Sequence, residues 1–97
     1  MLSEYYLKAE SDLTAQRDRI NRWTKRGLEG EDETLKRRYY EEIQGLESKC
    51  GAAEIALNTC KFSEPEDESA RERLEEALTD LRESMERFAR RFGLERD

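Results

Sequence analysis

The sequence predicts an all-α fold, an antiparallel up-down-up three-helix bundle with coiled-coil-like packing, in a single domain over residues 1–97. Three successive segments place apolar residues at alternating steps of three and four, which is the spacing of a helix–helix seam. Helix-capping residues separate these segments. Strand formers are scarce, since valine is absent and isoleucine occurs three times. A chain of 97 residues is the size of one small domain.

The first predicted helix covers residues 3–26. Gly27 follows it and can adopt the left-handed conformation that ends many helices, which lets Leu28 fold back towards Trp23. The predicted seam consists of Leu2, Tyr6, Ala9, Leu13, Gln16, Ile20 and Trp23.

The second predicted helix covers residues 33–61 and has Asp32 as its N-cap. Its seam holds both cysteines of the chain, ten residues apart. The seam residues are Tyr39, Ile43, Leu46, Cys50, Ala53, Leu57 and Cys60, with Leu35 beside them.

The third predicted helix covers residues 64–92. Ser63 as N-cap and Glu66 three positions later form a capping box, and Pro65 is tolerated in the first turn. Gly93 and Leu94 repeat the ending of the first helix. The seam consists of Ala70, Leu74, Leu78, Leu81, Met85, Phe88 and Phe92, with Ala77 at its flank.

The same three seams also fit two chains associated as an extended helical dimer, and the sequence alone does not separate this arrangement from a monomeric bundle. The chain is 43% charged, with a net charge of −6, so its overall field disfavours non-specific binding to nucleic acid or anionic lipid. No apolar run reaches the ~20 residues that cross a bilayer, and we expect neither a membrane segment nor an export signal.

The basic residues are concentrated at one end of the predicted bundle, which holds thirteen of the eighteen. Favourable placement in the field of the helix dipoles explains much of this arrangement. A patch for an anionic partner is the alternative function. Its candidate residues are Arg22, Lys25, Arg26, Arg37, Arg38, Arg90 and Arg91.

The sequence offers little for catalysis. Histidine is absent, and with it the commonest general base and metal ligand. Two cysteines are too few for a structural zinc site, which needs four ligands. Their separation corresponds to ~15 Å along a helix, which excludes a disulfide between them. We therefore predict a cytoplasmic protein that is not an enzyme, has no cofactor, metal or small-molecule substrate, and keeps both thiols in its core. A redox-responsive thiol is a weaker alternative.

Three apolar residues fall outside the predicted seams, namely Leu7, Ile55 and Phe62. Antiparallel pairing of the first two helices is expected to bring residues 7 and 52 level, which would gather the three side chains at one end. Exposed apolar patches are typical of interaction sites. The predicted function is a helical protein–protein interaction or scaffold module, whose partner is another protein or a second copy of the chain.

Overall fold

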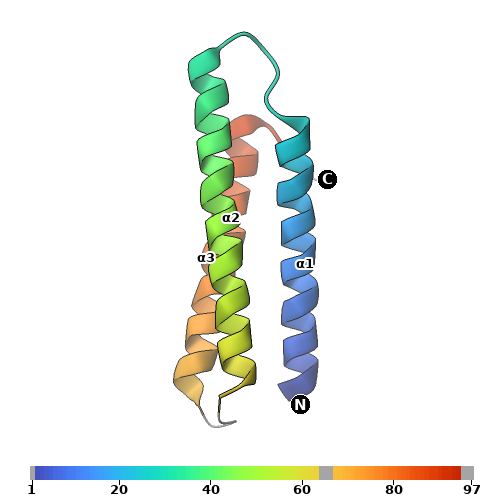
Figure 1. Cartoon of the computed structure of the whole chain (residues 1–97), viewed down its shortest axis with the longest axis vertical. Coiled ribbons are helices and arrows are strands. Elements are labelled where there is room, and N and C mark those ends of the chain that lie inside the picture. The colour runs from blue at the N-terminus through green and yellow to red at the C-terminus, as the bar shows by residue number, and fades with distance from the viewer. Residues whose placement is uncertain (1, 64–66, 95–97) are drawn as a thin grey trace.

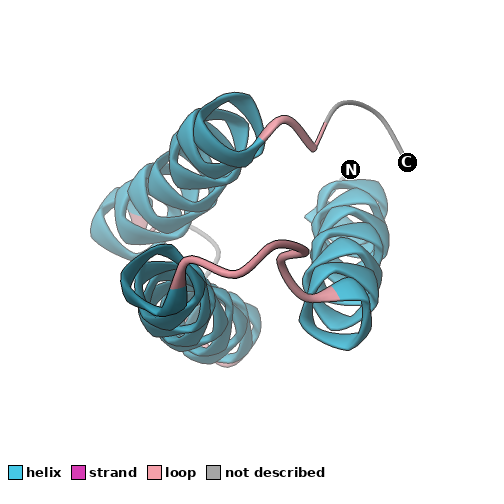
Figure 2. Ribbon diagram, turned by 90° about the horizontal axis from the view of Figure 1, so that it is seen from above, coloured by secondary structure: helices cyan, strands magenta, loops and turns pink. Residues whose placement is uncertain are grey.

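The computed structural model describes residues 2–63 and 67–94, which form three helices without any strand in these two ranges (Figure 1). Helix α1 spans Leu2–Arg26, α2 spans Glu33–Lys61 and α3 spans Glu68–Phe92. Successive helices run antiparallel, and seen end-on they occupy the corners of a triangle (Figure 2). The predicted three-helix bundle is confirmed.

The predicted helix ends are confirmed at three of the four positions that the structure describes. The side chain of Asp32 accepts the backbone N–H of Leu35 at 3.1 Å, as expected of an N-cap. Gly27 and Gly93 have φ angles of 64° and 67°, in the left-handed region. After Gly93, the N–H of Leu94 donates to the carbonyl five residues earlier at 2.7 Å, which is the longer hydrogen bond of a Schellman ending.

The predicted start of α3 is wrong. Its N-cap is Asp67, whose side chain accepts the N–H three residues later at 3.1 Å. The hydroxyl of Ser63 instead donates to the carbonyl of Thr59 at 2.7 Å and belongs to the end of α2. A carboxylate at an N-cap is also favoured by the helix dipole, which a serine hydroxyl does not exploit. Pro65 and Glu66, the other predicted members of this start, lie outside the described residues.

The three seams form one apolar core. All seven predicted positions of α2 are buried, as are four on α1 and six on α3. Phe92, Tyr6 and Gln16 are half-buried, and Leu35 is exposed because it lies in the first turn of α2. The buried seam residues outside α2 are Ala9, Leu13, Ile20, Trp23, Ala70, Leu74, Leu78, Leu81, Met85 and Phe88.

Aromatic side chains fill the end of the core near the α1–α2 loop. The rings of Trp23 and Tyr39 each pack on Phe88, with centroids 5.2 and 5.1 Å apart, and Phe92 joins them. The hydroxyl of Tyr39 donates to the carbonyl of Trp23 at 2.7 Å. Farther along α2, small buried residues such as Cys50 and Ala53 alternate with leucines.

Candidate functional site

Five large hydrophobic residues are exposed among those that the structure describes, and the three most exposed are the predicted contact residues. The exposed fractions are 65% for Leu7, 69% for Ile55 and 89% for Phe62. Ile55 lies in α2, and Phe62 follows seven residues later as the C-cap of this helix, so the two side chains leave nearly the same side of it about two turns apart. Leu7 lies on α1. Each of the three side chains is thus available for contact with another molecule.

The expected register between α1 and α2 is wrong, because the stretch of α1 that holds Leu7 lies level with the end of α2 rather than with residue 52. The hydroxyl of Tyr6 donates to the backbone carbonyl of Cys60 at 3.2 Å, which places this part of α1 against the last turn of α2. The prediction aligned the two helix ends at their loop, but α2 extends past the end of α1 there (Figure 1). Ile55 is therefore two turns from Leu7 and Phe62.

Ile55 and Phe62 belong to a longer strip on the outer face of α2 that the sequence reading missed. The strip repeats at steps of three and four, as the buried seam does, and all its members are exposed. Its signal in the sequence is weak, because four of its members are small or polar. We call it the outer strip, and it comprises Gly45, Ser48, Ala52, Ile55, Thr59 and Phe62.

The outer strip carries no charge, although the chain is 43% charged. Four charged residues occur between its first and last members, and three of them turn to neighbouring helices. Lys49 pairs with a carboxylate of α3, whereas Glu54 and Lys61 pair with side chains of α1. The fourth, Glu47, is exposed at the flank of the strip. Because α2 carries apolar residues both on its buried seam and on the outer strip, it is the least amphipathic of the three helices.

Two glycines of α2 lie on or beside the outer strip, and the fold of one chain does not require either of them. A Cβ atom built on Gly45 or Gly51 meets no heavy atom within 4 Å. Glycine inside a helix is destabilising by roughly 0.5–1 kcal/mol relative to alanine. The two glycines therefore weaken α2 without relieving any contact within the bundle.

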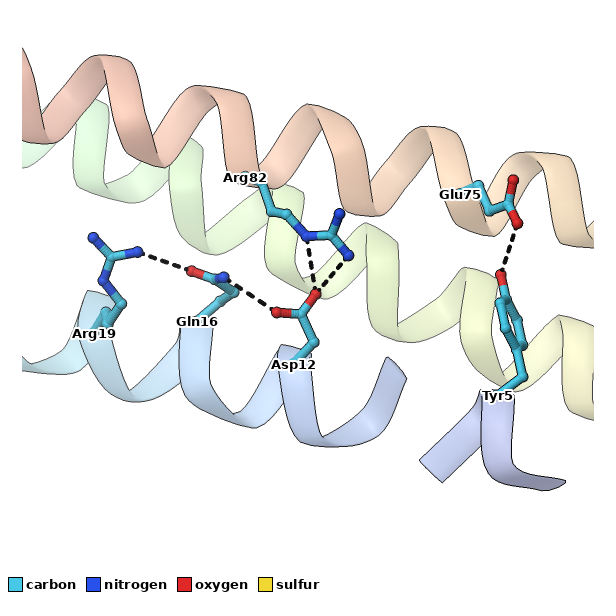
Figure 3. Close-up of polar contacts among 6 residues, drawn as sticks. All are labelled: Tyr5, Asp12, Gln16, Arg19, Glu75 and Arg82. Atoms are coloured by element: carbon cyan, nitrogen blue, oxygen red, sulfur yellow. Dashed lines mark hydrogen bonds and ion pairs between the residues drawn. The ribbon is translucent and has the colours of Figure 1, made fainter. Parts of the chain in front are cut away.

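A groove of about 740 Å³ lies between α1 and α3, which approach each other less closely than either approaches α2. Polar contacts cross it (Figure 3). Arg82 donates two hydrogen bonds to Asp12, at 2.9 and 3.1 Å, and the hydroxyl of Tyr5 donates to Glu75 at 3.3 Å. Burial, and then the Glu75 carboxylate, raise the pKa of Tyr5. Because the charged groups that cross this groove are paired with each other, it offers a small ligand few unsatisfied groups.

Both cysteines are buried and free, as predicted. Burial raises the pKa of the Cys50 thiol, and the nearby Arg17 only partly opposes this. Cys60 donates its thiol proton to Tyr6 Oη at 3.6 Å, and this hydrogen bond is the main cause of a raised pKa at Tyr6. Reactive cysteines need access and a lowered pKa, so this environment favours a structural role for Cys50.

The seven predicted anion-binding residues are all exposed, and they lie at the ends of α1 and α3 and near the start of α2. Arg91 is neutralised by an ion pair with Glu42 across α2 and α3. The other six come from three helices, and Arg37 and Arg38 follow each other on α2, which directs them to different sides of that helix. The structure thus places the seven at one end of the bundle.

Among residues 2–63 and 67–94, no three or more cysteine or carboxylate side chains come together in a group that could hold a metal ion. None of the helices described combines the length and apolar character that a bilayer-spanning segment needs. Comparison with models of protein families, with curated proteins and with solved structures finds no match to this chain.

Proposed function

We propose that this chain is a non-catalytic helical module that binds protein through the outward apolar residues Leu7, Ile55 and Phe62. The observation that carries the proposal is their exposure, up to 89% at Phe62, on an otherwise highly charged chain. Removing such side chains from water contributes roughly 1.5–3 kcal/mol each. A coiled-coil-like contact with a partner helix would bury the side chains of Ile55 and Phe62 together.

The supporting chemistry is that of a scaffold rather than an enzyme. The buried polar contacts secure helices to each other, as the hydroxyl of Tyr39 does at Trp23. The thiols are enclosed. Two free thiols also suit a reducing compartment, and we propose that the protein acts in the cytoplasm.

Capture from a lysate of the native host tests the proposal, with the full chain immobilised and bound proteins identified by mass spectrometry. The double variant Ile55→Glu/Phe62→Glu should lose proteins that the original chain retains. Ser11→Glu is the matched control, because Ser11 is exposed on the side of α1 that faces the α1–α3 groove. Circular dichroism confirms that each variant is helical. The proposal fails if neither self-association nor any captured protein depends on the outward apolar residues.

The second candidate function is binding of an anionic partner at the basic end. The observation that favours it is the exposure of all seven predicted cations at one end of the bundle. The net charge of −6 and the Arg91–Glu42 pair act against it. Retention on a polyanion column that falls steeply with salt would support this function. Elution in the flow-through at low salt would refute it.

A further inference from the structure

We propose that the partner of the outer strip is a second copy of this chain, with the two α2 helices packed antiparallel in a two-fold symmetric dimer. This inference rests on the proposed function and specifies its partner and contact geometry. It follows from the order of residue sizes along the strip, from its lack of charge and from its glycines.

The outer strip is self-complementary in size when it is reversed. A two-fold axis through its midpoint sets its first residue opposite the last residue of the other copy. Gly45 then faces Phe62, Ser48 faces Thr59, and Ala52 faces Ile55. Each layer combines one small and one larger side chain, as a well-packed helix pair requires. Two-fold symmetry repeats every layer.

Parallel pairing of the same strip does not have this property. It would place Phe62 against Phe62 at one end and Gly45 against Gly45 at the other. The first end would then hold too much side-chain volume, and the second would be left with a gap. Gaps and overfilled layers both weaken helix packing. The size order of the strip therefore selects the antiparallel arrangement.

The charges and glycines of α2 agree with this geometry. In the antiparallel dimer, Lys49 of one copy lies near Ala56 of the other. The contact therefore brings no like charges together on the side of the outer strip where Lys49 lies. Two chains that each carry −6 repel one another overall, which makes an uncharged strip the favourable place to meet. Gly45 and Gly51 leave open space on the monomer, and this space lets a second backbone approach closely.

The contact is small, which sets the expected affinity. The strip spans 17 residue steps, about 26 Å at 1.5 Å per residue, and one helix is about 10 Å wide. It covers a few hundred Å² per copy, whereas stable interfaces cover ~800 Å² per partner. We therefore expect a weak dimer that forms at roughly micromolar to millimolar concentrations.

Sedimentation velocity on the full chain tests the dimer over a range from roughly 1 μM to 1 mM, which brackets that affinity. The original chain should show concentration-dependent dimers, and Ser11→Glu should match it. Ile55→Glu should weaken the dimer at least about tenfold, because two charges enter one symmetric contact. Gly45→Leu should weaken it by obstructing Phe62, and Gly45→Leu/Phe62→Ala should restore it by exchanging the large and small positions. Gly45 is exposed and a Cβ atom added there meets no heavy atom within 4 Å, so we expect Gly45→Leu to fold, which circular dichroism checks.

Cysteine cross-linking tests the orientation. A mixture of the variants Ser48→Cys and Thr59→Cys should form disulfide-linked dimers under mild oxidation, because the two positions share a layer. Ser48→Cys alone should not, because its two copies would lie eleven residues apart, about 16 Å along the helix axis. The buried native thiols provide a low background, measured on the original chain.

Three results would overturn the inference: a chain that stays monomeric up to ~1 mM, a dimer insensitive to Ile55→Glu, or cross-linking of Ser48→Cys with itself. If the chain stays monomeric but capture from a lysate still depends on Ile55 and Phe62, the dimer is refuted and the proposed function is retained. If neither self-association nor capture depends on these residues, the proposed function is refuted as well.

Discussion

Three glycines of this chain should respond to alanine substitution with opposite signs. Gly45→Ala and Gly51→Ala should each stabilise the folded chain, because both glycines lie inside α2 and an added Cβ meets nothing within 4 Å. The gain is roughly 0.5–1 kcal/mol per site, part of which comes from the reduced freedom of the unfolded chain. For a domain of this size that raises Tm by about 2–8 °C per site.

Gly27→Ala is the matched control and should destabilise. Its φ of +64° requires the left-handed conformation, which costs an L-residue roughly 1–2 kcal/mol. An added Cβ would also stand 2.6 Å from the hydroxyl oxygen of Tyr40, which would have to move. The same chemical change therefore lowers the free energy of unfolding at this position.

Urea unfolding followed by circular dichroism measures all three variants, at a few micromolar protein so that self-association contributes little. The m-value should remain unchanged, since none of the variants alters the surface that unfolding exposes. A loss of stability on Gly45→Ala or Gly51→Ala in dilute solution would refute the reasoning, because it would mean that the site is not an open helical position.

Three further predictions concern single contacts within the bundle. Asp67→Ala should lower the free energy of unfolding by about 1 kcal/mol in urea titrations, whereas Ser63→Ala should change it by less than about 0.5 kcal/mol; the reverse order would contradict the α3 start. Tyr39→Phe should cost about 1 kcal/mol by the same measurement, because a buried hydroxyl no longer donates to Trp23. Burial raises the pKa of the Cys50 thiol in the folded chain. Above about pH 8.5 the thiol therefore ionises in the unfolded chain first, and the free energy of unfolding should fall as pH rises. Cys50→Ala should lessen this dependence of the free energy of unfolding on pH.

Local signals predicted most of the fold. The apolar spacing of α2 predicts seven seam positions, and all of them are buried. Asp32, Gly27 and Gly93 were identified as helix ends from residue type alone, because a cap depends on a few neighbouring atoms. These features are encoded within one or two helical turns, where sequence spacing and distance in space correspond closely.

The errors arose where the sequence offered competing or non-local choices. Ser63 and Asp67 are both good N-caps four residues apart, and the choice depends on how α2 ends, where Ser63 already donates to Thr59. The α1–α2 register depends on how far one helix slides along the other, which no short motif records. The ion pair between Glu10 and Lys61 reflects this offset.

The outer strip was missed for a different reason, namely that a search for apolar repeats finds the large residues first. Ile55 and Phe62 were recognised as outward-facing, but Gly45, Ser48 and Ala52 carry little hydrophobic signal. Their spacing becomes visible only once the buried face is known and the opposite face can be examined. The residues of the proposed contact are thus present in the sequence, but its small members cannot be distinguished there from other exposed positions.

The side chains of the outer strip are all exposed and take no part in the buried core of the chain. Gly45 and Gly51 serve neither capping nor core packing, and glycines inside a helix reduce its stability; Phe62 caps the end of α2 through its backbone N–H, but this role does not require its exposed ring. Solubility would favour charged residues at the position of Phe62, which is 89% exposed. The two glycines thus lower the stability of α2, and the exposed ring of Phe62 lowers the solubility of the chain, at or beside the same uncharged strip. The proposed binding at that face would account for both losses together, because the space left by each glycine and the exposed ring can complement one another only when a second helix is present.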